Sequence, residues 1–399
     1  MLLRLLTAAL ALATGTIASP VARSNETKKD WDLDWMSTDP SLPKVMQVPW
    51  HIYSTGGTIL SASNYSRLDN IAYGSGDNPT PEDLISNIPE VLSVAQLAII
   101  QFPTTEGGSA GVNSSLYLNI SQHANRQLCA EGSDVAGAVM FHGTDTLEET
   151  VSGGFGAFGV DLTFNCSKPF VATGAMRPDT YISPDGYANI YQAVAAAASP
   201  SSRDRGGLIA FNDRITSVYY STKLNANTPD TFKSLEQGNL GAFLAGQPYY
   251  FFGAAYPTGR PHFDVTTTTE LPSVAVLYCH QGFDASLMYA AVDSGAKGLV
   301  ILGPGAASLS PSAAAAAADL FEKGVPTIAA PRPATGAGIP HPATGSLIYS
   351  GYLGGEQARI MLQLAINAGY DLEQIRDLFE RHLRNAVYDP AANQKFYYP

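Results

Sequence analysis

In the first half of the chain, from about residue 46 onward, short β-rich runs alternate with helical stretches. Strands that alternate with helices form parallel sheets covered on both faces. The pattern therefore predicts a parallel-rich sheet flanked by helices. The expected strands are Val48–Tyr53, Leu97–Phe102, Val135–Phe141, Pro169–Thr173 and Gly207–Phe211, and the expected helices are Pro81–Val94, Leu147–Phe158 and Tyr187–Ala198.

A second alternation follows a break in this pattern. Residues 212–265 are irregular and rich in Gly, Pro and Tyr, and prolines and a threonine run interrupt 255–271. We expect an α/β protein with a larger N-terminal domain (46–255), a linker (256–271) and a smaller C-terminal α/β domain (272–399). The second set of expected strands is Val274–Tyr278, Gly298–Leu302, Thr327–Ala330 and Ser346–Ser350, and the helices are Ala285–Ser294, Ala313–Lys323, Gly355–Ala368 and Leu372–His382.

The N-terminal residues differ from the rest. In residues 1–19, Arg4 precedes the apolar run Leu5–Ala13 and small residues follow it. This run is shorter than the roughly 20 residues that span a bilayer, so it predicts a secretory signal peptide, with a signal anchor as the alternative. A secreted protein, extracellular or in a cell wall, is the expectation. Residues 20–45 are polar and interrupted by prolines, which predicts a flexible arm.

Composition narrows the class of protein. The 399 residues carry a net charge of −12, with 45% hydrophobic and only 15% charged residues. The acidic balance argues against a nucleic-acid partner, and the apolar content is too high for global disorder. Beyond the N-terminus no apolar run reaches membrane-spanning length, so no membrane partner is expected.

Secretion would give meaning to two further features. Five sequons, which glycosylation could use in a eukaryotic host, lie at Asn25, Asn64, Asn113, Asn119 and Asn165. Of the three cysteines, Cys129 and Cys166 could pair in an oxidising compartment. Cys279 adjoins an apolar run and is better explained as a buried thiol than as a nucleophile.

Two polar clusters follow expected strands, where ligands bind in open α/β sheets. The first is Ser54-Thr55-Gly56-Gly57-Thr58, in which Thr58 offers a hydroxyl nucleophile. The second is His142-Gly143-Thr144-Asp145-Thr146. Taken singly, they are better explained by a tight turn and by an N-cap. Together they favour one catalytic crevice. Neither a Ser-His-Asp signature nor metal-ligand spacing occurs, so we expect no metal and no cofactor.

The motifs resemble those of the bacterial-type L-asparaginase (asparaginase–glutaminase) family, over about residues 46–385. They are Thr55–Ile59, His142–Thr150, Gly174-Ala175-Met176-Arg177-Pro178, Asp185-Gly186, and Phe211-Asn212-Asp213 followed by Ser221-Thr222-Lys223. The resemblance implies a hydrolase that converts L-asparagine to L-aspartate and ammonia through an acyl-enzyme on a threonine. It also implies a Cys129–Cys166 disulfide and a homotetramer built as a dimer of dimers.

Individual roles follow from the same resemblance. Thr58 corresponds to the nucleophile, and the mobile-loop tyrosine falls on Tyr73, with Tyr65 as the alternative. Thr144, Asp145 and Lys223 correspond to the second catalytic cluster, in which Asp145 and Thr144 also contact the substrate. Ser109 matches the serine that binds the substrate carboxylate, and Ala175 lines the oxyanion region.

The chain departs from the family where a neighbouring subunit completes the site. The small-domain stretches 278–282 and 338–343 contain no clear match for the family's Asn and Glu, and no acid occurs from Ala329 to Gly355. His280, Gln281 or His341 are the available substitutes. A missing acid leaves two alternatives open: activity on L-glutamine or another ω-amide, or an amino-acid-binding protein that has lost turnover.

Overall fold

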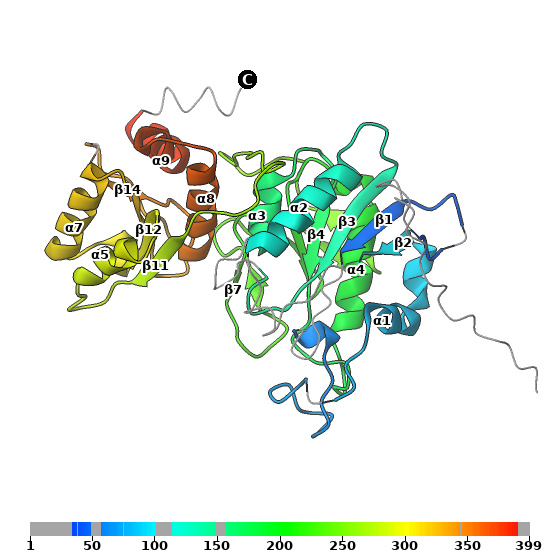
Figure 1. Cartoon of the computed structure of the whole chain (residues 1–399). Coiled ribbons are helices and arrows are strands. Elements are labelled where there is room, and N and C mark those ends of the chain that lie inside the picture. The colour runs from blue at the N-terminus through cyan, green and yellow to red at the C-terminus, as the bar shows by residue number, and fades with distance from the viewer. Residues whose placement is uncertain are drawn as a thin grey trace, which may run out of the picture.

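The computed structural model describes residues 34–37, 39–48, 57–74, 76–100, 114–147, 156–343 and 345–389. They form two α/β units, each built on its own main sheet (Figure 1). The predicted fold class, a larger sheet flanked by helices plus a smaller C-terminal α/β domain, is confirmed.

The larger sheet has eight strands in the order β10-β9-β6-β5-β4-β3-β1-β2. The five strands from β2 to β5 run parallel, and β6, β9 and β10 continue the sheet antiparallel. The strands are β1 (Lys44–Val48), β2 (Gln96–Ile99), β3 (Val135–Phe141), β4 (Phe170–Thr173), β5 (Leu208–Phe211), β6 (Arg214–Ser217), β9 (Gly241–Leu244) and β10 (Gln247–Tyr250). A short hairpin, β7 (Thr222–Lys223) with β8 (Phe232–Lys233), stands apart from it.

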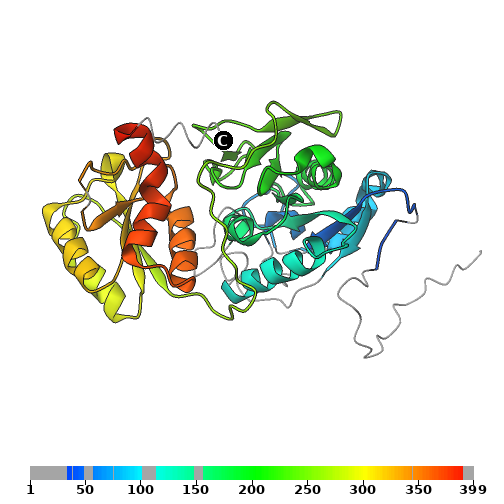
Figure 2. The ribbon, with the colours of Figure 1, turned by 90° about the horizontal axis from the view of Figure 1, so that it is seen from above.

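Successive side chains of the parallel strands are buried on opposite faces of this sheet. Met46, Met140 and Ala172 belong to the hydrophobic cluster that includes α2 (Ser114–Leu128) and α3 (Gly156–Thr163). The residues next to them along each strand, such as Val139 and Val171, belong to the cluster that includes α1 (Pro81–Asn87) and α4 (Gly186–Ala198). Figure 2 shows α2 and α4 on opposite sides of the sheet. Both faces are therefore covered, as apolar parallel strands require.

The smaller unit carries a four-stranded parallel sheet, β11-β12-β13-β14. Its strands are β11 (Val274–Tyr278), β12 (Gly298–Gly303), β13 (Thr327–Pro331) and β14 (Leu347–Tyr349), and its helices are α5 (Ser286–Asp293), α6 (Pro304–Ala307), α7 (Pro311–Glu322), α8 (Gly355–Asn367) and α9 (Leu372–Tyr388). Helix α8 lies beside the larger unit (Figure 1), where Gln357 donates to the Ser221 carbonyl at 3.1 Å.

The N-terminal half differs from the sequence expectation at several points. The expected helix 81–94 divides into α1 and a 3-10 turn, Pro89–Ser93, because Pro89 has no N–H for a helical hydrogen bond. Helix α2 was not predicted, because its Ser, Asn, Gln and His residues obscure the buried Leu118, Ala124 and Leu128. The chain joins the sheet at Lys44, inside the range expected for the arm, and Trp35 bridges Ala98.

Parts of other expected elements lie outside the described residues, namely most of the strand 48–53, the end of the strand 97–102 and most of the helix 147–158. The signal peptide 1–19 also lies there. Within the described part of the chain, no helix is long and apolar enough to cross a bilayer.

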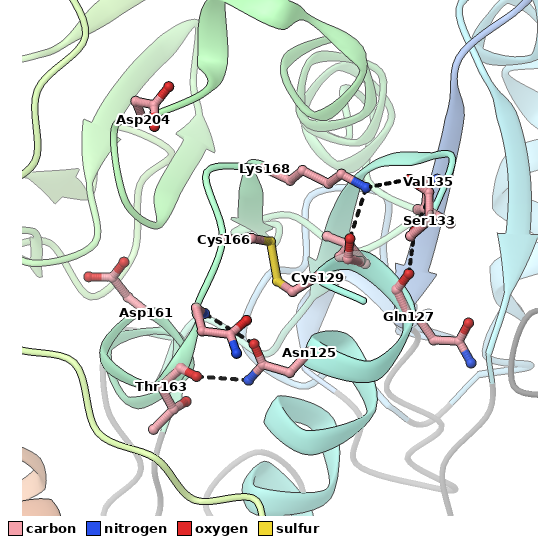
Figure 3. Close-up of a disulfide and its surroundings, with 12 residues drawn as sticks. Asn125, Gln127, Cys129, Ser133, Val135, Asp161, Thr163, Cys166, Lys168 and Asp204 are labelled. Atoms are coloured by element: carbon pink, nitrogen blue, oxygen red, sulfur yellow. Dashed lines mark hydrogen bonds between the residues drawn. A yellow bond between two sulfur atoms is a disulfide. The ribbon is translucent and has the colours of Figure 1, made fainter. Parts of the chain in front are cut away.

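The expected disulfide is present. Cys129, after the end of α2, is bonded to Cys166, ahead of β4 (Figure 3). The same junction is held by Asn125, which donates to the Thr163 carbonyl, and by Lys168, which donates to the Leu128 and Ser133 carbonyls. Cys279 is a buried free thiol. Helix α2 is therefore bound covalently and by hydrogen bonds to the segment that leads into β4.

Candidate active site

Thr58 begins a buried 3-10 turn, Thr58–Leu60, directly after Gly57. Gly57 has φ 70° and ψ 158°, a conformation that residues with a Cβ atom avoid. A Cβ at this position would lie 2.3 Å from the Cα of Gly143. The backbone of the first polar cluster therefore touches the backbone of the second. Ser54, Thr55 and Gly56 lie outside the described residues.

The second cluster brings together the three side chains expected there. Lys223, on β7, donates to the Thr144 hydroxyl at 3.1 Å and to the Asp145 carboxylate at 2.6 Å. Thr144 is buried, whereas the Asp145 side chain is 71% exposed. An ion pair with so exposed a partner adds little to stability. The Lys223 charge is thus better placed to act on a hydroxyl or a water beside Thr144 than to hold the fold together.

His142 lies beneath this cluster and is fully buried. Its Nδ1 is 2.6 Å from the carbonyl oxygen of Gly143, so the neutral ring donates this hydrogen bond. Burial lowers the pKa of His142 to about 4. A neutral ring that is already bonded to the backbone supports the turn and is not placed as a proton-transfer group.

The segment that follows β4, beginning with Gly174, adjoins the same cluster. A Cβ on Gly174 would lie 2.6 Å from the His142 carbonyl oxygen and 3.1 Å from the Thr144 methyl carbon. Ala175, the next residue, is fully buried. Gly57 and Gly174 therefore let their two segments approach the His142–Thr144 turn without a side chain between them.

Two polar residues without an assigned role support this third strand end. Asn189 donates to the Gly174 carbonyl at 2.9 Å, and Asp185 accepts from the backbone N–H groups of Met176 and Arg177. Burial raises the pKa of Asp185 above its ordinary value. The sequence signal that could have indicated this role is a polar residue, Asn189, within the apolar helix expected at 187–198.

The loop that carries the candidate tyrosines is bonded to two distant segments. The Arg67 carbonyl accepts from the N–H of Ile182, and Asn70 donates to the Asn227 carbonyl at 3.2 Å. Asn227 follows β7, the strand that holds Lys223, so the loop is bonded to the segment after that strand. Tyr73 is half-buried, whereas Tyr65 is 74% exposed.

The remaining expected site residues are placed as follows. Ser109 lies outside the described residues, as do the sequons at Asn25 and Asn113, whereas Asn64, Asn119 and Asn165 are exposed. Glycosylation at these sequons stays a prediction. His280, Gln281 and His341 lie in the smaller unit and are exposed. No group of three or more His, Cys, Asp or Glu residues in the described ranges is arranged to hold a metal ion.

Comparison with known proteins identifies the relatives of this chain. Residues 51–255 match the family model for the N-terminal asparaginase domain, and residues 273–379 match the glutaminase/asparaginase C-terminal domain. The chain is 39% identical to probable L-asparaginase 1 of Schizosaccharomyces pombe, over 87% of this chain and 91% of that protein. It is 35% identical to L-asparaginase 2 of Bacillus subtilis, over 96% of this chain and 99% of that protein.

A solved structure is similar as well. The crystal structure of a probable cytoplasmic L-asparaginase from Campylobacter jejuni superimposes with a TM-score of 0.74 at 28% identity, covering 84% of this chain and 99% of that one. This comparison contradicts the expectation of a secreted, extracellular or cell-wall protein. The names of the Schizosaccharomyces and Bacillus relatives do not mark them as secreted either. A short apolar N-terminal run was therefore an insufficient basis for that expectation.

Proposed function

Because the chain belongs to the asparaginase family of amidohydrolases, we propose that it hydrolyses L-asparagine to L-aspartate and ammonia, with Thr58 as the nucleophile. The observation that carries this proposal is the backbone contact of Gly57 with Gly143. It sets the Thr58 turn against the turn that holds Thr144, Asp145 and Lys223, so that one substrate can reach both.

The reaction proceeds in two steps. In the first, the Thr58 Oγ bonds to the side-chain amide carbon and gives up its proton. The C–N bond then breaks, and the nitrogen leaves as ammonia with that proton. In the second, a water adds to the β-aspartyl ester, the ester C–O bond breaks, and Thr58 and L-aspartate are regenerated.

Each remaining residue has a defined task in this scheme. We assign proton acceptance from Thr58 to Tyr73, because its half-buried position suits a base better than the exposed Tyr65. Lys223 polarises Thr144 or the hydrolytic water, and Asp145 pairs with the substrate ammonium group. Ser109 binds the substrate carboxylate, and the Ala175 backbone contacts the amide.

The direct test is ammonia release from L-asparagine by the purified protein. Thr58→Ala should lower kcat by about 10⁴-fold or more, since it removes the attacking oxygen. Thr327→Ala is the matched control, because Thr327 is equally buried but lies on β13 of the smaller unit. Full activity of Thr58→Ala would exclude Thr58 as the nucleophile.

The two alternatives give different results in the same assay. A larger kcat/KM for L-glutamine than for L-asparagine would assign the enzyme to ω-amides other than asparagine. Calorimetric binding of L-asparagine without any turnover over hours would indicate a binding protein. The absence of an acid between Ala329 and Gly355 makes this substrate comparison informative.

We also propose a homotetramer, a dimer of dimers, in which His280, Gln281 or His341 of one subunit approaches the Thr58 site of another. These residues lie in the smaller unit and are exposed, which leaves them available to a second copy. Light scattering should give the mass of four chains, and an active monomer would contradict the assembly. We retain 256–271 as the linker between the two domains.

A further inference from the structure

The two peptide groups that flank Ala175 are each held by a side chain of the helix α4 region. Asn189, buried in α4, donates to the Gly174 carbonyl at 2.9 Å, and its own oxygen accepts from the Asn212 N–H at 3.0 Å. Asp185 accepts from the Met176 N–H at 3.1 Å, from the Arg177 N–H at 2.9 Å and, more weakly, from the Asn189 side chain at 3.3 Å. Both peptides on either side of one residue are therefore fixed in orientation.

Planar trans peptides turn these anchors into directions for Ala175. In a trans peptide the C=O and the N–H point to opposite sides, and the described residues contain no cis peptide bond. Since the Gly174 C=O points to Asn189, the Ala175 N–H points away from it. Since the Met176 N–H points to Asp185, the Ala175 C=O points away from Asp185. Asn189 thus fixes the direction of the Ala175 N–H, a donor, and Asp185 fixes the direction of the Ala175 C=O, an acceptor.

The position of these two groups links them to the chemistry. Gly174 lies against the His142 carbonyl and the Thr144 side chain, so Ala175 is the residue next to the second cluster. Among the described residues, the Ala175 N–H and C=O have no other hydrogen-bond partner. Buried peptide groups are nearly always bonded to something. A primary amide offers an acceptor and a donor that would satisfy both.

Asp185 does not cap its own helix, although it is the residue placed to do so. It is the N-cap residue of α4, yet its side chain makes no capping hydrogen bond to that helix. An Asp at an N-cap ordinarily accepts from the second or third N–H of its own helix. Here the carboxylate turns instead to residues 176 and 177, so helix capping does not explain it.

We propose that Asp185 and Asn189 are positioning residues that act through Ala175, with separate tasks: Asp185 aims the Ala175 carbonyl at the substrate NH₂, and Asn189 aims the Ala175 N–H at the substrate carbonyl oxygen. This inference rests on the proposed function and deepens it. It makes Asp185 a determinant of selectivity for amides over esters, because an ester has no N–H to donate. Asn189 serves both substrate types equally.

The test compares L-asparagine with the β-methyl ester of L-aspartate. Asp185→Asn keeps the shape of the side chain but removes its charge and replaces one acceptor oxygen with an NH₂ group, whereas in the wild type both oxygens accept from the Met176 N–H. It should lower kcat/KM for the amide by about tenfold or more, because the Ala175 carbonyl would be displaced from the substrate NH₂. The kcat/KM for the ester should fall much less. Asn189→Ser should lower both by a similar factor.

Gln192→Ala is the matched control. Gln192 lies on the same helix, is also buried, and donates to Asp213 instead of the segment 174–177. Gln192→Ala should lower the melting temperature while the amide-to-ester ratio stays at the wild-type value. If Asp185→Asn fails to fold, Asp185→Ser, whose hydroxyl can accept from one N–H, replaces it.

The outcomes separate this inference from the function on which it rests. An unchanged amide-to-ester ratio in the Asp185 variants of an active enzyme would overturn the inference and leave the function intact. The inference would also be overturned if Gln192→Ala shifted the ratio as Asp185→Asn does, since the role would then be merely structural. A wild-type protein that hydrolyses neither substrate would instead overturn the proposed function.

Discussion

The contact between Gly57 and Gly143 predicts a large effect of one added methyl group. In Gly57→Ala the new Cβ would lie 2.3 Å from the Gly143 Cα, whereas ordinary contact begins near 3.4 Å, so the two backbones must separate by about 1 Å. The φ of 70° adds strain of about 1–3 kcal/mol. We expect kcat/KM for L-asparagine to fall by about 10²-fold, because a displacement of this size misaligns Thr58 with the second cluster.

Gly132→Ala separates strain from displacement. Gly132 also has a positive φ, 79°, but a Cβ there would meet nothing within 4 Å. Ammonia-release kinetics and urea unfolding of both variants are the assay. Gly132→Ala should lose about 1 kcal/mol of unfolding free energy and keep wild-type kcat/KM. If Gly57→Ala keeps wild-type kcat/KM as well, the backbone contact does not align the site and the reasoning fails.

Other perturbations test the roles of His142, Lys223 and the disulfide. Because the pKa of His142 is about 4 in the fold and near 6.5 when unfolded, the unfolded chain takes up the proton first, and stability is lost as the pH falls from 6.5 toward 4. Urea titrations should show that about 2 kcal/mol of unfolding free energy is lost between pH 7 and pH 5, and that this loss is absent in His142→Gln. If the unfolding free energy depends on pH equally in the wild type and the variant, the buried neutral His142 is not the cause. Lys223→Met should lower kcat by about 10³-fold while the unfolding free energy changes by less than about 1 kcal/mol, because Asp145 is mostly exposed. A marked fall in the unfolding free energy with kcat unchanged would instead show that the Lys223–Asp145 pair is structural. Replacing Cys129 and Cys166 with Ser opens a loop of 37 residues, and calorimetry should show a loss of about 4 kcal/mol, whereas an unchanged melting temperature would contradict this estimate.

The sequence predicted much of the fold because local signals agreed with the tertiary structure. The strand Val135–Phe141 is where the apolar run placed it, and in the smaller unit every expected helix and strand is present within a few residues. The failures have local causes. Pro89 ends a helix whose hydrophobic pattern continues past it, and α2 buries only a narrow apolar stripe among polar residues.

The sequence predicted which residues belong to the candidate site but did not predict which of them are in contact. Resemblance selected Thr144, Asp145 and Lys223, which the structure brings within hydrogen-bond distance. Gly57 and Gly143 lie in the segments that follow β1 and β3 along the chain, and the sequence pattern does not specify that these two strands are neighbours. Asn189 was missed because a buried amide in an apolar helix has no sequence signature for its partner.

In the proposed mechanism, Thr58 is the residue that carries the acyl group. Acid-quenched mixtures of the wild-type protein with L-asparagine, analysed by intact-protein mass spectrometry and peptide mapping, test this most directly. We predict a mass increase of one β-aspartyl group on the peptide that contains Thr58, absent in Thr58→Ala and present in Thr327→Ala. An adduct on a different residue, or unchanged ammonia release by Thr58→Ala, would contradict the mechanism.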